Sequence, residues 1–424
     1  MYQKTTLDNG LRILTGAMPH TRSASILLFL GAGQRHEPKE LTGISHYIEH
    51  MLFKGTQRRP TAQEISEAIE GLGGSLNAST GREYTDYFAV VPSPQFALAL
   101  DVLTDMLTGS RFDPDEIERE RQVITEEINS INDSPPDLVN QLIEETMWGD
   151  QAIGRDVAGT RETVARITRE QMLDHKARHY LPQTTVVSVA GQVEHDMVVR
   201  LVTAAFGAAD GARPVPIIAP AASDQTDPRI ALLTKDTEQT NLCIGLPALS
   251  YKDPERYVQQ MLDGVLGSGM SSRLFVEIRE KRALAYSVSS YVQSYHDIGG
   301  FIVHAAVDNE RVESCLEGVL HELERMRQEP VPPTELDKVK EFHKGHLLLA
   351  MESSRAVAGW MGRQELLLDH IESVDEVIEQ IDVVTPAQVL DLAQRLFTTE
   401  KLNLSVVGPM EQAADRWREL LVLG

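Results

Sequence analysis

The chain has 424 residues, of which 42% are hydrophobic, and a formal net charge of −23. A chain of this length exceeds the size at which one hydrophobic core usually keeps growing, so we expect two or more domains. The acidic balance leaves no basic surface of the kind that binds phosphate backbones, which argues against nucleic acid as a partner.

Residues 1–10 lack the apolar stretch of a secretory signal, and no later segment has transmembrane length without charges. We therefore expect a cytoplasmic chain with no membrane partner. Cys243 and Cys315 are too few for a disulfide framework or a cysteine-built metal site, so we expect two buried free thiols. Any metal site must then draw on the 13 histidines.

Several elements can be predicted in chain order. Residues 23–30 alternate in the manner of a strand. The region 41–56 has apolar residues three and four apart and reaches Gly55, which predicts a helix. A second amphipathic helix is expected over 115–130, and its counterpart in the second half over 334–349.

The sequence matches itself at an offset of 217 residues. Residues 167–194 and 384–411 are identical at nine of 28 positions without a gap, including Ser188 with Ser405. Both copies predict a helix after an N-terminal threonine, Thr168 or Thr385, followed by a buried strand. The chain therefore contains one unit twice.

The expected fold class is α+β, with two tandem homologous α/β-sandwich domains. The proline-rich, polar stretch 213–228 has the character of a linker. This places a first domain at 1–212 and a homologous second domain at 229–424.

The predicted helix over 41–56 contains the sequence His46-Tyr47-Ile48-Glu49-His50. Residues four apart project from the same helix face, so His46 and His50 can bind a single zinc ion. Glu49 lies on that side without being needed as a ligand, in an order inverse to His-Glu-x-x-His that occurs in zinc peptidases.

A third ligand is expected from the helix over 115–130. Glu120 and Glu127 are seven residues apart, close to two turns, and so have similar directions around the helix. Glu126 falls about 100° away.

With these motifs the chain resembles the pitrilysin-like family (M16) of inverted-motif zinc peptidases. Within that family it is most similar to the two-domain members, which are bacterial proteins and proteins like the mitochondrial processing peptidase. That family pairs His-x-x-Glu-His with a distant Glu-x₆-Glu. The resemblance extends over the whole chain and includes the runs 76–80, 84–87, 271–275 and 279–288.

The resemblance implies a zinc metalloendopeptidase with one zinc ion per chain, held by His46, His50 and Glu127. Glu49 is implied as the general base that takes a proton from water and passes it to the leaving amine. Glu120 is implied to hold a ligand histidine in its orientation, although it could also be a solvated surface residue.

The resemblance also implies that Arg279 and Tyr286 stabilise the substrate and the developing oxyanion, and that substrates add as a strand beside Asn77 and Ala78. An ordinary surface arginine, a core tyrosine and a plain strand edge are the alternatives. Ala283 stands where relatives usually have glycine.

The second half has no His-x-x-Glu-His at the corresponding place, 257–264, which implies one catalytic and one inactive domain. Relatives with four such domains enclose their substrate, so two copies of this chain are expected to form a homodimer around unfolded peptides. Two other classes stay open: a structural subunit, as in respiratory complexes, and a peptide-binding chaperone.

Overall fold

The computed structural model describes the chain except for residues 1, 210–217, 369 and 411–413. It forms two compact units, each composed of three chain segments. The first unit comprises 1–128, 156–219 and 348–373, and the second comprises 129–155, 220–347 and 374–424.

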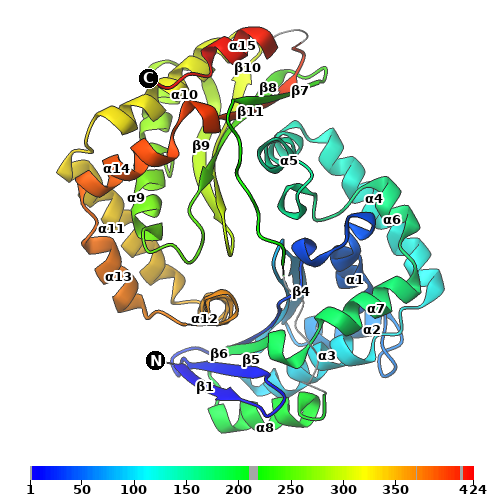
Figure 1. The fold of residues 1–424 in the computed structure, drawn as a ribbon. Helices are drawn as coiled ribbons and strands as arrows, with labels where there is room; N and C mark the ends of the chain where they lie inside the picture. The colour runs from blue at the N-terminus through cyan, green and yellow to red at the C-terminus, as the bar shows by residue number, and fades with distance from the viewer. Residues whose placement is uncertain (1, 210–217, 369, 411–413) are drawn as a thin grey trace. The chain divides into compact units, whose positions relative to one another are not determined.

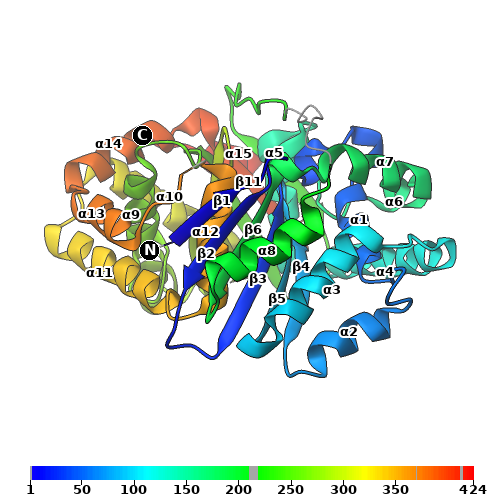
Figure 2. The same ribbon diagram turned by 90° about the horizontal axis from the view of Figure 1, so that it is seen from below.

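The first unit, which begins with the strands coloured blue in Figure 1, contains a six-stranded mixed sheet in the order β1-β2-β6-β3-β5-β4, and all six strands are labelled in Figure 2. The only parallel pair joins β2 to β6, and the other neighbours are antiparallel. The strands are β1 (Tyr2–Thr6), β2 (Arg12–Ala17), β3 (Ser23–Leu30), β4 (Ser75–Thr80), β5 (Thr85–Pro92) and β6 (Thr185–Gly191).

The second unit contains a five-stranded sheet in the order β7-β11-β8-β10-β9. Its parallel pair joins β7 to β11, so the order and directions repeat those of β2-β6-β3-β5-β4. This confirms the duplication, with β1 as an addition to the first unit. The strands are β7 (Arg229–Thr234), β8 (Gln239–Ala248), β9 (Ala285–Ser294), β10 (Gly299–Asp308) and β11 (Asn403–Gly408).

Helices cover both faces of the first sheet, because successive strand residues alternate between two hydrophobic clusters. Ile26 and Leu28 of β3 pack with α1, α3 and α8, whereas Leu27 and Phe29 pack with α12. Figure 2 shows α3 and α8 crossing one face of this sheet. The helices of this unit are α1 (Ile44–Leu52), α2 (Ala62–Glu70), α3 (Phe96–Gly109), most of α4 (Pro114–Asp133), α6 (Arg161–Arg166), α7 (Arg169–His179), α8 (His195–Phe206) and α12 (Ser354–Leu367).

The second unit repeats this layering. Helix α5 packs on one face of its sheet, where Val139 and Ile143 meet Ile302 and Val407. The helices of this unit are α5 (Pro135–Trp148), α9 (Arg256–Leu266), α10 (Val312–Gln328), most of α11 (Pro333–Ala350), α13 (Val374–Asp382), α14 (Pro386–Leu396) and α15 (Ala414–Leu420).

Each half of the sequence therefore supplies one helix to the unit formed mainly by the other half. Helix α5 of the first half packs on β8 and β11, and α12 of the second half packs on β3 and β6. The repeated serines explain part of this arrangement. Ser188 Oγ donates to the carbonyl of Ala358 in α12 at 2.7 Å, and Ser405 Oγ donates to the carbonyl of Val139 in α5 at 3.0 Å.

The predicted elements are confirmed at 23–30, 115–130 and 334–349, and Thr168 and Thr385 cap α7 and α14. The helix expected over 41–56 is shorter, because α1 spans only Ile44–Leu52. The linker at 213–228 begins within 210–217, outside the described residues, so that division of the sequence stays a prediction.

Cys243 and Cys315 are buried free thiols, as predicted. Within the described residues, no helix is both long and apolar enough to cross a membrane.

Candidate metal centre

Helix α1 carries the inverted motif because its two faces differ. Tyr47, Ile48 and Met51 are buried in the core of the first unit, which leaves His46 and His50 on the other side. Gly43 caps the N-terminus of the helix, and its φ of 98° is in the left-handed region.

Glu37 binds the start of α1 from outside the helix. Its two carboxylate oxygens accept the backbone N–H groups of Gly43 and Ser45, each at 2.8 Å. A carboxylate at this position satisfies amides that have no partner within the helix and complements the helix dipole. The start of the histidine-bearing helix is thereby fixed.

Helix α4 brings the two predicted glutamates to α1. Ile117 and Ile124 pack in the same core, and the hydroxyl of Tyr47 donates to the carbonyl of Ile117. This contact joins α1 to α4 one turn before Glu120, and Glu127 follows two turns later.

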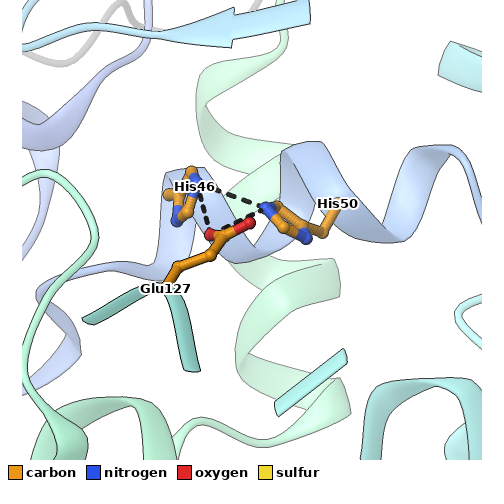
Figure 3. A group of neighbouring side chains, drawn as sticks. All are labelled: His46, His50 and Glu127. Atoms are coloured by element: carbon orange, nitrogen blue, oxygen red, sulfur yellow. Dashed lines mark hydrogen bonds and ion pairs between the residues drawn. The ribbon is translucent and has the colours of Figure 1, made fainter. Parts of the chain in front are cut away.

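Three side chains converge between these helices (Figure 3). His46 Nε2 lies 3.3 Å from His50 Nε2, and Glu127 Oε2 lies 3.7 Å from the first nitrogen and 3.5 Å from the second. Ligand atoms about 2.0–2.1 Å from a tetrahedral zinc ion are about 3.3–3.4 Å apart. The spacing and the donor set therefore fit zinc with little adjustment. No other group of three possible metal ligands occurs among the described residues.

The charges around the centre favour a cation. Burial lowers the pKa of His46 to about 4, helped by the neighbouring His50, so this imidazole is neutral and can offer a lone pair. Burial would also lower the pKa of His50, but the hydrogen bond with Glu120 and the charges of Glu127, Glu120 and Glu49 outweigh it and raise the pKa. The negative charge of these carboxylates also attracts a divalent cation.

Glu49 lies on α1 between the two histidines and is held by the neighbouring sheet. Thr80 Oγ1, at the end of β4, donates to Glu49 Oε2 at 2.5 Å. Burial raises the pKa of Glu49 despite this hydrogen bond. A carboxylate with a raised pKa can both take up and release a proton during a reaction.

Glu120 is buried and has two partners. Its Oε2 atom lies 3.0 Å from His50 Nδ1, and its Oε1 atom lies 2.7 Å from the ammonium of Lys54. The solvated-surface alternative for Glu120 is wrong, because only 6% of its side chain is exposed. Lys54, which follows the end of α1, was not singled out by any sequence pattern.

Asn77 and Ala78 lie on β4, which among the described strands pairs only with β5 and forms an edge of the first sheet. The side chain of Asn77 points outward and its Oδ1 atom accepts the backbone N–H of Ala78 at 2.8 Å. The resemblance implied an edge strand at these positions, and β4 lies at the end of the sheet, whereas substrate addition beside Asn77 and Ala78 stays a prediction.

Arg279 and Tyr286 belong to the second unit and contact each other. The guanidinium of Arg279 lies 5.3 Å from the ring centre of Tyr286 and 4.8 Å from that of Phe275. Tyr286 is 73% exposed, so the core-tyrosine alternative is wrong. Between them, Ala283 has a φ of 48°, a strained value that explains why glycine is expected there.

The corresponding helices of the second unit carry no such centre. In α9, Gln260 Nε2 lies 3.1 Å from His343 Nδ1 of α11, where the first unit has its histidines and glutamates. This agrees with the missing motif in the second half.

Comparisons with known proteins identify the family. Residues 12–161 match the family described as Insulinase (Peptidase family M16), and residues 166–342 match the Peptidase M16 inactive domain. The chain belongs to peptidase family M16. An uncharacterized zinc protease of Streptomyces coelicolor is 39% identical over 96% of this chain and 90% of its own length. The uncharacterized zinc protease YmxG of Bacillus subtilis is 35% identical over 96% of this chain and 98% of its own length.

Solved structures share the fold of this M16 peptidase. A protease from Helicobacter pylori has a TM-score of 0.92 at 22% identity, covering 96% of this chain and 99% of its own. A chain of complex III2 from Candida albicans has a TM-score of 0.85 at 21% identity, and the match covers 99% of this chain and 100% of that chain. The protein is a zinc-dependent peptidase, as the resemblance implied, and the structural-subunit and chaperone alternatives are not supported.

Proposed function

We propose that this M16 peptidase is an endopeptidase that cleaves unfolded peptides at a centre formed by His46, His50 and Glu127. The observation that carries the proposal is the convergence of their three ligand atoms next to Glu49. One zinc ion per chain would supply a Lewis acid for water and for the peptide carbonyl.

Glu49 is the proton carrier in this proposal. Its carboxylate takes a proton from the attacking water and passes it to the nitrogen of the leaving amine, so one group serves as base and then as acid. Thr80 holds one carboxylate oxygen and thereby fixes which oxygen is free for the proton.

The same hydrogen bond suggests how the substrate is presented. Thr80 is the last residue of β4, so an extended peptide added to the open edge of this strand runs next to Glu49. Backbone hydrogen bonds to β4, near Asn77 and Ala78, would accept many sequences but only an extended chain.

We therefore expect cleavage of unfolded peptides of roughly ten to several tens of residues, but not of folded proteins, because a compact domain cannot offer a free strand. The test compares a disulfide-intact folded protein with its reduced, alkylated form, with products measured by mass spectrometry. Cleavage should stop with a zinc chelator and return with added zinc. Equal cleavage of both forms contradicts the proposal, as does activity that persists without metal.

We further propose that the working unit is a homodimer in which Arg279 and Tyr286 of one protomer complete the centre of the other. The support is that these two side chains contact each other, with Tyr286 largely exposed, in the unit whose described residues form no group of three metal ligands. A phenol and a guanidinium are suitable donors to a developing oxyanion.

Subunit complementation tests this arrangement. Glu49→Gln and Tyr286→Phe should each be inactive as homodimers, whereas a mixed dimer contains one site with both native groups. We expect about half of the wild-type activity per mixed dimer, since one of two sites is restored. Absence of recovery after demonstrated subunit exchange would assign both groups to one chain.

A further inference from the structure

We propose that Lys54 is a positioning residue of the metal centre, which acts through Glu120 to orient His50. This inference rests on the metal site of the proposed function. The three side chains form a continuous series, from the Lys54 ammonium to Glu120 Oε1 at 2.7 Å and from Glu120 Oε2 to His50 Nδ1 at 3.0 Å. Each carboxylate oxygen of Glu120 thus has its own partner.

The orientation of His50 depends on which of its nitrogens carries the proton. When Nδ1–H donates to a carboxylate, Nε2 keeps its lone pair for a metal and the ring plane is fixed. His50 Nε2 is the atom that faces His46 and Glu127, at 3.3 and 3.5 Å. Glu120 therefore directs the ligand nitrogen into the centre only while its own carboxylate is held still.

Lys54 supplies that restraint. Only 6% of the Glu120 side chain is exposed, so water has little access to replace a lost partner, and a buried carboxylate with an oxygen unpaired is costly. Without the ammonium, the carboxylate could rotate and meet His50 through either oxygen. Two carboxylates, those of Glu120 and Glu127, lie within 3.5 Å of His50. The ammonium of Lys54 offsets the negative charge of Glu120.

The backbone holds Lys54 in position for this contact. Its N–H donates to the carbonyl of Met51 at 3.2 Å, one turn back in α1. The next residue, Gly55, has a φ of 112°, and a Cβ there would lie 2.3 Å from the carbonyl oxygen of Pro60. Glycine therefore suits this turn, which takes the chain away from the helix directly after Lys54, while the Lys54 side chain contacts Glu120 of α4.

The test measures zinc affinity by competition with a chromogenic chelator, so it does not depend on peptidase activity. We expect Lys54→Met to weaken zinc binding by about 10-fold, the lower end of the roughly 10–100-fold effect of removing a direct partner of a metal ligand, because Lys54 acts one contact further out. Lys54→Arg keeps the charge and should stay within about threefold of wild type. Arg119→Met is the matched control, because Arg119 is exposed, lies next to Glu120 in sequence and contacts Glu116 instead.

A double-mutant cycle shows whether Lys54 acts through Glu120. Once Glu120→Gln has removed the carboxylate, adding Lys54→Met should change zinc affinity little further. The double variant contains no unpaired buried charge. Its comparison with Glu120→Gln therefore remains informative if the single Lys54→Met variant does not fold. The melting temperature of the zinc-free proteins monitors the fold.

Wild-type zinc affinity in folded Lys54→Met would overturn the inference, and so would additive losses in the double variant. Failure of the wild-type chain to bind zinc would instead reject the metal site itself. The two failures are therefore distinguishable.

Discussion

Glu49→Gln is expected to retain zinc but to lose at least about 100-fold in kcat, because general-base assistance contributes ~10²–10⁴-fold. Glutamine has nearly the same shape, and its amide oxygen can still accept the hydrogen bond that Thr80 now donates at 2.5 Å. The metal ligands are unchanged. The substitution therefore removes the proton acceptor and little else.

Kinetics with an internally quenched peptide and metal analysis of the same preparation measure the two effects separately. Glu67→Gln is a suitable control, since this glutamate lies on α2 and accepts a hydrogen bond from exposed Gln63. Near-normal turnover in a fully zinc-loaded Glu49→Gln protein would remove Glu49 from the mechanism. Loss of zinc in that variant would place Glu49 among the ligands.

Glu127→Ala should lose zinc itself, with affinity falling by more than about 100-fold, because a direct ligand contributes more than the partners behind it. The side chain of Glu127 is 44% exposed, against 18% for His46 and 16% for His50. Its removal therefore leaves no large cavity, and the zinc-free fold should persist.

Glu126→Ala provides the matched control for Glu127→Ala. It removes the same charge from the adjacent residue of α4, and Glu126 is exposed. Zinc affinity of this control should remain within about threefold of wild type. Full zinc loading of Glu127→Ala, together with loss in Glu126→Ala, would transfer the third ligand to Glu126.

Local sequence patterns predicted the framework of the centre well. The apolar spacing around His46 and His50 predicts a helix with both imidazoles on one side, since this depends only on the helical repeat. The seven-residue spacing of Glu120 and Glu127 predicts a shared helix face for the same reason. The selection of Glu127 as the third ligand came from family resemblance, because spacing alone does not bring a distant helix to α1.

The contacts of Thr80 and Lys54 were not predictable in the same way. Thr80 was part of a run that resembled the family, yet its hydrogen bond to Glu49 depends on how β4 lies beside α1. Lys54 follows the end of α1, and its ammonium reaches Glu120 on α4, a helix distant in sequence. Neither contact leaves a periodic signal, since each joins residues from different elements.

The sequence by itself determined the duplicated α+β organisation, the inverted histidine motif and the absence of that motif in the second half, because these follow from repeats and from spacing within single elements. Only the tertiary structure decided which helices belong to which unit. Helices α5 and α12 pack on sheets formed mainly by the other half of the sequence. Their apolar faces show that each must be buried but do not specify against which sheet, because hydrophobic burial is not directional. That choice depends on packing and on contacts such as Ser188 with Ala358 and Ser405 with Val139.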